Sequence, residues 1–208
     1  MTAPLYNLLD RQTHILVAGA TGSGKSVLIR GYLNHIITNR PRCQFVLIDP
    51  KRVDLLPFKS NQNVIYYART ETANRILSAT ALLMMDRYRQ IERGTPPDRF
   101  APVYIVIDEL ADLYLTARKA VEPLQKLAML GRAAQIHLIT ATQRPTRELL
   151  PMAIKCNYDC RVALRTATAQ DSRNITGFPG AEKLPRFGSC LIVCPDHLDP
   201  VIYQVPNI

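Results

Sequence analysis

A short glycine-rich segment constrains the fold of this chain more than any other feature. Residues 19–26 read GATGSGKS and fit the pattern G-x-x-x-x-G-K-[ST] of a phosphate-binding loop. The apolar run His14–Ala18 precedes the segment, and apolar residues at helical spacing follow it over Lys25–Asn39. Glycines let backbone N–H groups turn towards phosphates, and the start of the following helix adds a positive field. Strand, loop and helix together predict a nucleotide site, whereas a glycine-rich turn that binds nothing would not require both neighbours.

The roles expected within this loop follow from the chemistry of phosphate and magnesium. Lys25 is expected to reach the β- and γ-phosphates, and the Ser26 hydroxyl is expected to hold Mg²⁺. The cofactors implied are therefore ATP and Mg²⁺. The other residues predicted to bind the nucleotide are Thr21, Gly22, Ser23 and Gly24.

Two carboxylates follow a second apolar run. Val103–Ile107 reads as a buried strand, and Asp108 and Glu109 come directly after it. Carboxylates at the end of a buried strand cost free energy unless a partner compensates them, and Mg²⁺ would do so. Asp108 is predicted to hold the ion, and Glu109 to polarise the attacking water as general base. The alternative is a strand end that is simply solvated.

A third apolar run, Ile136–Ala141, also ends in polar residues. If this strand lies between the loop strand and the Asp108 strand, Gln143 reaches the γ-phosphate from the side. Gln143 could then report hydrolysis to the segment beyond it. His137 lies within the apolar run, and we interpret it as a packing residue rather than a ligand.

Short apolar runs alternate with longer helical patterns along the chain, which is typical of an α/β fold with a mainly parallel sheet. The expected strands are His14–Ala18, Gln44–Asp49, Val103–Asp108, Ile136–Ala141, Arg161–Leu164, Ser189–Cys194 and Pro200–Val205. The expected helices are Lys25–Asn39, Thr72–Arg93, Arg118–Ala134 and about Arg147–Lys155. No linker is visible in the 208 residues, so we expect one domain over residues 1–208.

Charge and composition narrow the class of protein. The formal net charge of +9 is compatible with a polyanionic partner such as nucleic acid, and equally with an ordinary basic protein. No apolar run approaches the ~18 residues of a membrane span, and the N-terminus does not read as a signal peptide. The five cysteines, an odd number, suggest reduced thiols. These features predict a cytoplasmic protein.

Taken together, the motifs resemble the motor domain of the FtsK/SpoIIIE family of double-stranded DNA translocases. The matching segments are His14–Ser26, Leu47–Lys51 (LIDPK), Met85–Tyr88 (MDRY), Ile105–Leu113 (IVIDELADL), Gly131–Pro145, Arg161–Leu164 and Asp171–Ile175 (DSRNI). The resemblance implies a three-layer RecA-like P-loop NTPase core and a homo-hexameric ring with ATP at the subunit interfaces. Double-stranded DNA would pass through the pore. The sequence departs from the family in one respect, because relatives usually carry a membrane region, an accessory domain and a winged-helix module that are not read here. We therefore expect an FtsK-type ATPase motor domain alone, with any membrane anchor belonging to a partner.

The resemblance further suggests roles for basic residues. Arg132 matches the family's arginine finger, which acts on the site of a neighbouring subunit. The alternative for Arg132 is a surface arginine at a helix end. Arg144, Lys155 and Arg173 match basic positions near the pore loops and are candidate DNA contacts, although each could be a solvated surface charge. No role is assigned to Lys51.

The leading hypothesis is therefore an ATPase that moves double-stranded DNA. Conjugation coupling proteins and type VII secretion ATPases share this core, so a motor that moves or recruits protein cargo is the alternative. A scaffold that does not hydrolyse ATP is disfavoured, because it would have no chemical need for the whole set of Lys25, Ser26, Asp108, Glu109 and Gln143. Chromosome segregation, conjugation and mobile-element replication all fit the leading hypothesis.

Overall fold

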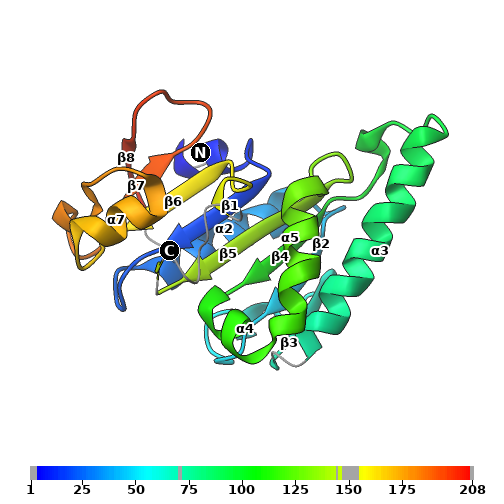
Figure 1. Ribbon diagram of the computed structural model, residues 1–208, viewed down its shortest axis with the longest axis horizontal. Coiled ribbons are helices and arrows are strands. Elements are labelled where there is room, and N and C mark those ends of the chain that lie inside the picture. The colour runs from blue at the N-terminus through cyan, green and yellow to red at the C-terminus, as the bar shows by residue number, and fades with distance from the viewer. Residues whose placement is uncertain (1–3, 70–71, 144, 147–154, 207–208) are drawn as a thin grey trace.

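The structure is a computed structural model that describes residues 4–69, 72–143, 145–146 and 155–206. An eight-stranded sheet runs through the molecule in the order β3-β2-β4-β5-β1-β6-β7-β8 (Figure 1). Neighbouring strands are parallel from β3 to β6, while β7 is antiparallel to both of its neighbours. The strands are β1 (His14–Ala18), β2 (Gln44–Ile48), β3 (Val64–Tyr67), β4 (Val103–Ile107), β5 (Ile136–Thr142), β6 (Cys160–Leu164), β7 (Ser189–Val193) and β8 (Val201–Gln204).

Helices cover both faces of the sheet, which makes the predicted three-layer α/β arrangement (Figure 1). One face carries α1 (Pro4–Leu9) and α2 (Lys25–Asn39). The other face carries α3 (Ala73–Glu92), α4 (Leu110–Thr116), α5 (Val121–Leu130) and, towards β6 and β7, α7 (Ala169–Thr176). Short 3-10 turns complete the chain at Leu56–Phe58, Pro97–Arg99, Arg118–Ala120 and Ala181–Lys183.

The alternation of side chains along each strand divides the apolar core between the two faces. In β1, Ile15 and Val17 pack with α1 and α2, whereas Leu16 belongs to the core beneath α3, α4 and α5. All five residues of β1 are buried, as parallel strands covered on both faces should be. His137 stacks on Tyr104 of the neighbouring strand with ring centroids 4.6 Å apart, which is a packing role.

The predicted, mainly parallel sheet is confirmed, and each expected strand agrees with the structure to within one residue at either end. The expected helix Arg118–Ala134 is too long: Arg118–Ala120 forms a 3-10 turn, and α5 ends at Leu130. After Gly131 the chain makes a tight turn, in which the Ala134 N–H donates to the Gly131 carbonyl oxygen at 3.0 Å and Gln135 has a φ angle of 54°. The expected helix Arg147–Lys155 falls mainly on residues 147–154, which lie outside the described part of the chain.

Several elements were not predicted. The edge strand β3 is short and only half-buried, so it lacks a clear apolar pattern. The helix α7 is mostly polar, and neighbouring residues determine where it begins and ends. The Thr168 and Asp171 side chains form a capping box at its start, and Gly177 ends it with a φ angle of 90°. Among the described residues, none of the helices is long and apolar enough to cross a lipid bilayer.

Candidate active site

The glycine-rich loop joins the carboxyl end of β1 to α2 in the middle of the sheet. Gly22 and Gly24 have φ angles of 73° and 96°, a conformation that side-chain-bearing residues rarely adopt. A Cβ atom at Gly19 would lie 2.6 Å from Ser23 Oγ and 3.0 Å from Leu164 Cβ, so a side chain here would crowd the loop. In the described structure no side chain caps the N-terminus of α2, which starts at Lys25. Its first N–H groups are therefore available to an anion.

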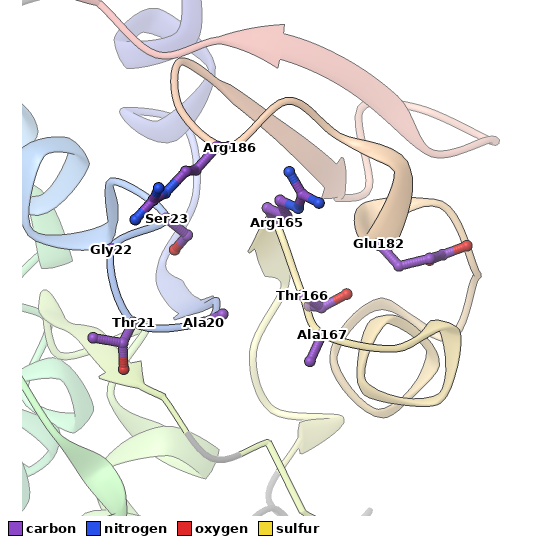
Figure 2. A pocket seen from close by; sticks show the side chains of 9 residues that line it. All are labelled: Ala20, Thr21, Gly22, Ser23, Arg165, Thr166, Ala167, Glu182 and Arg186. Carbon is purple, nitrogen blue, oxygen red and sulfur yellow. The ribbon is translucent and has the colours of Figure 1, made fainter.

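A cavity of about 470 Å³ opens beside the loop (Figure 2). Its size is in the range of small-molecule sites. The loop segment 20–23 forms one wall, and residues 165–167, Glu182 and Arg186 form the other. Arg186 reaches towards the loop: its Nη2 atom lies 3.9 Å from where a Cβ of Gly22 would be. Sequence patterns did not indicate Arg186, because it comes from a segment that precedes β7 and bears no motif.

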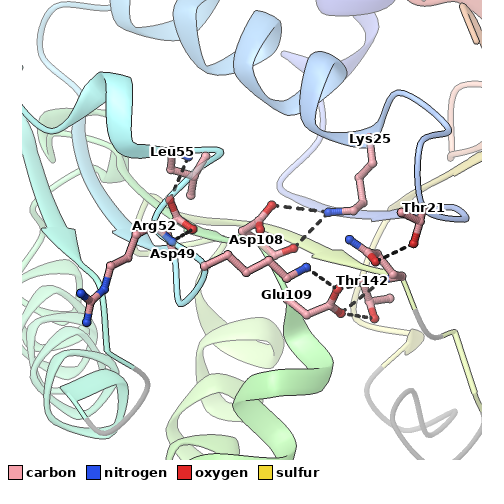
Figure 3. A network of polar contacts seen from close by, with 10 residues as sticks. Thr21, Lys25, Asp49, Arg52, Leu55, Asp108, Glu109 and Thr142 are labelled. Carbon is pink, nitrogen blue, oxygen red and sulfur yellow. Dashed lines mark hydrogen bonds and ion pairs between the residues drawn. The ribbon is translucent and has the colours of Figure 1, made fainter.

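Lys25 and Asp108 form a buried pair on the other side of the loop (Figure 3). The Lys25 ammonium donates to the Asp108 carbonyl oxygen at 3.2 Å and lies 3.4 Å from Asp108 Oδ1. Burial raises the pKa of Asp108, and the Lys25 charge opposes this shift. Within the described residues, the buried Oδ2 atom has no hydrogen-bond partner. This free carboxylate oxygen suits a hard cation, as predicted for Asp108.

Glu109 is also buried, and its carboxylate is held from the β5 side. Thr142 Oγ1 donates to Glu109 Oε1 at 2.8 Å, and the Gln143 backbone N–H lies 3.2 Å from both carboxylate oxygens. The Gln143 side chain accepts a hydrogen bond of 3.0 Å from Thr21 Oγ1 in the loop. Gln143 therefore connects the phosphate-binding loop with Glu109.

A contact that sequence reasoning missed comes from the turn after β2. The ammonium of Lys51 lies 3.5 Å from Glu109 Oε2. The sequence offered one signal, since LIDPK follows the same pattern as the Asp108 strand, an apolar run with charged residues at its carboxyl end. In parallel strands these ends meet at one edge of the sheet.

The sheet order explains why these residues converge. β5 lies between β4 and β1, which is the condition on which the prediction for Gln143 depended. Residues that follow β1, β4 and β5 therefore meet at one carboxyl edge. Ser26 lies in the first turn of α2 at the same edge and is partly exposed.

Arg132 lies at the opposite edge of the sheet. It is exposed in the turn between α5 and β5, and its charge contributes to lowering the pKa of His14 at the start of β1. The length of β1, roughly 16 Å at 3.3 Å per residue, separates this edge from the loop. Arg132 therefore does not belong to the cluster around Lys25 in its own chain.

The candidate DNA contacts differ in their surroundings. Arg173 is exposed on α7. Lys155 is only 7% exposed, and its ammonium donates to the Asn174 carbonyl oxygen at 3.1 Å, so it contacts protein rather than solvent. Arg144 lies outside the described residues.

The donors present fit a magnesium nucleotide. The glycine cradle excludes side chains, Lys25 supplies a cation, and Ser26 and Asp108 supply hard oxygen atoms. The buried Ser23 hydroxyl, in the loop itself, has no hydrogen-bond partner among the described residues, and Ser23 lines the adjacent cavity. Fold and site together define a P-loop NTPase.

Comparison with known proteins specifies the family. Residues 1–95 and 90–147 match the FtsK/SpoIIIE family, and the chain belongs to this family. It is 36% identical to DNA translocase FtsK of Chlorobaculum tepidum over 96% of its length and 35% identical to that of Staphylococcus epidermidis over 91%. The chain spans 28% and 27% of the length of these curated relatives.

Solved structures show the same fold. The conjugation coupling protein TcpA of pCW3, solved with ATPγS, superposes with a TM-score of 0.83 at 24% sequence identity. The match covers 94% of this chain and 60% of the TcpA chain. The type VII secretion ATPase EccC of Thermomonospora curvata, solved as its cytoplasmic domain, superposes with a TM-score of 0.81 at 25% sequence identity. The match covers 94% of this chain and 25% of the EccC chain.

Proposed function

We propose that this chain is an ATPase motor domain that moves double-stranded DNA, with ATP hydrolysed between the subunits of a homo-hexameric ring. The observation that carries this proposal is the division of the chemistry between two edges of one sheet. Lys25, Asp108, Glu109 and Gln143 gather at the carboxyl edge, while Arg132 is exposed at the amino edge. We place the protein in the cytoplasm, alone or with a membrane-anchored partner.

The residues of the carboxyl edge have complementary tasks. Lys25, the loop N–H groups of Thr21–Gly24 and the start of α2 would bind the phosphates. Ser26 and Asp108 would hold Mg²⁺, which neutralises phosphate charge when bound. Glu109 would accept a proton from the attacking water. Gln143 would couple the loop to the segment after β5, because it contacts both Thr21 and Glu109.

Arg132 would complete the site of a neighbouring subunit. An arginine supplied in trans stabilises charge that develops in the transition state, so hydrolysis depends on assembly. A mixing experiment tests this arrangement. Arg132→Ala and Lys25→Ala should each abolish turnover alone, and a mixture should regain part of the activity, because some interfaces pair an intact loop with an intact arginine. A mixture as inactive as its components would contradict a role in trans.

Phosphate contacts would supply the grip on DNA. Arg173 is exposed and available for such contacts, and Arg144 follows Gln143 directly in the sequence. Lys155 would have to release the Asn174 carbonyl before it could bind a phosphate. Contacts of this kind carry little sequence information and weaken as salt rises.

A protein cargo is the second candidate function, and the fold shared with EccC and TcpA is the observation that favours it. The two functions differ in what stimulates hydrolysis. Duplex DNA should raise the ATPase rate of a DNA motor, whereas a motor for protein cargo should respond to a cargo polypeptide.

A further inference from the structure

The segment after β2 has a fixed shape, and Asp49 is its centre. Asp49 is fully buried. Its Oδ1 accepts the Arg52 backbone N–H at 3.0 Å, and its Oδ2 accepts the Leu55 backbone N–H at 3.0 Å (Figure 3). The Tyr66 hydroxyl also donates to Oδ2, at 3.1 Å. A buried carboxylate with this many donors ties the following residues to the end of β2.

The turn that results presents Lys51 to the neighbouring strand end. The Arg52 N–H also donates to the Asp49 carbonyl oxygen at 3.2 Å, and Arg52 has a φ angle of 57°, unusual for a residue with a side chain. β2 pairs in parallel with β4, so the residues after the two strands lie side by side. The Lys51 ammonium reaches Glu109 Oε2 at 3.5 Å.

Lys51 differs from the other groups that contact Glu109. Thr142 and Gln143 both belong to the end of β5, and they hold the carboxylate from that side. Lys51 follows β2, which lies on the other side of β4 in the sheet order. Its side chain is 38% exposed, whereas that of Glu109 is 5% exposed, so a half-exposed cation is paired with a buried carboxylate.

We propose that Lys51 is a positioning residue for Glu109: the turn organised by Asp49 places the Lys51 ammonium on Oε2 and fixes the carboxylate between β2 and β5. The inference rests on the proposed function, in which Glu109 is the general base. Misplacement of a catalytic group lowers the rate of the chemical step more than it changes substrate binding.

Steady-state kinetics separate positioning from nucleotide binding. Lys51→Met should lower kcat about tenfold, equivalent to about 1.4 kcal/mol, while KM for ATP and the affinity for a fluorescent non-hydrolysable ATP analogue stay within about twofold. Lys51→Arg should restore most of kcat, because it keeps a cation at this place. Lys59→Met is the matched control: it removes an exposed lysine from the same segment and should leave kcat unchanged.

A thermal double-mutant cycle on the protein without nucleotide tests the contact independently. Lys51→Met and Glu109→Gln should lower the Tm non-additively, with a coupling of about 2–4 °C. Unchanged kcat in Lys51→Met, a loss confined to nucleotide affinity, or additive Tm shifts would each overturn the inference. If the unmodified chain hydrolyses no ATP, the proposed function fails, while the thermal cycle still decides whether Lys51 holds Glu109.

Discussion

Acidification should loosen the strand that leads into the phosphate-binding loop, because His14 at its start must stay neutral. The backbone N–H of Leu138 donates to His14 Nδ1 at 3.1 Å, so Nδ1 must be unprotonated and the ring proton resides on Nε2. His14 is only 3% exposed. Burial lowers its pKa to about 4; the charges of His137 and Arg132 add to this shift, and Asp159 opposes it.

The size of the effect follows from this pKa. In the unfolded chain a histidine titrates near 6.5, so between pH 6.5 and 4 the unfolded state binds the proton more readily than the folded state. The stability contributed by neutral His14 is therefore complete above pH 6.5 and is lost as the pH falls towards 4. At pH 5 the loss amounts to about 2 kcal/mol.

Urea unfolding at pH 7 and pH 5 measures this loss. Burial also lowers the pKa of His137 to about 4, so the unmodified chain carries contributions from both histidines. His14→Asn is the informative variant, because its Oδ1 is bonded to Cγ as Nδ1 is and can accept the Leu138 N–H without titrating. Between pH 7 and pH 5 this variant should lose about 2 kcal/mol less stability than the unmodified chain. An equal loss in both proteins would refute the reasoning.

Further predictions concern the site itself. Glu109→Gln should lower kcat about 10²- to 10⁴-fold and keep affinity for an ATP analogue, as measured by turnover and fluorescence titration; normal hydrolysis would remove Glu109 as the base. Gly24→Ala should lower the free energy of unfolding by about 1–2 kcal/mol, because Gly24 has a φ angle of 96° that alanine adopts only with strain. The variant should show a lower Tm and weak nucleotide binding, and an unchanged Tm would contradict the strain. Thr142→Val should lower kcat by removing the 2.8 Å hydrogen bond to Glu109, with KM unchanged; a change in KM alone would instead place Thr142 at the nucleotide.

Much of the site could be predicted because its parts are local in sequence. The loop 19–26 carries a motif with strand and helix on either side, and Asp108, Glu109 and Gln143 follow clear apolar runs. Parallel strands bring their carboxyl ends to one edge of the sheet, so the order of the motifs along the chain was nearly sufficient to predict which residues meet in the site.

The remaining features depend on long-range packing that no local pattern records. The partner of Lys51 became visible only once β2 was placed beside β4. Arg186 reaches the loop from a segment that bears no motif. The prediction for Lys155 treated a basic residue as exposed, yet packing buries its ammonium against the Asn174 carbonyl.

The length of α5 and the identity of α7 show the same limit. Helical periodicity continued past Leu130, but the Ala134 and Ile136 N–H groups both donate to the Gly131 carbonyl oxygen, and this tight turn leads the chain into β5. In α7 the apolar stripe is weak, and the capping box at Thr168 and Asp171 was the signal that could have located it.

The most direct test of a DNA motor is the steady-state ATPase rate with and without long double-stranded DNA, at low and at high salt. We predict strong stimulation by duplex DNA at low salt that fades as salt rises, because contacts to phosphates release counterions. A rate that duplex DNA leaves unchanged at either salt concentration would contradict DNA translocation and would favour a protein cargo.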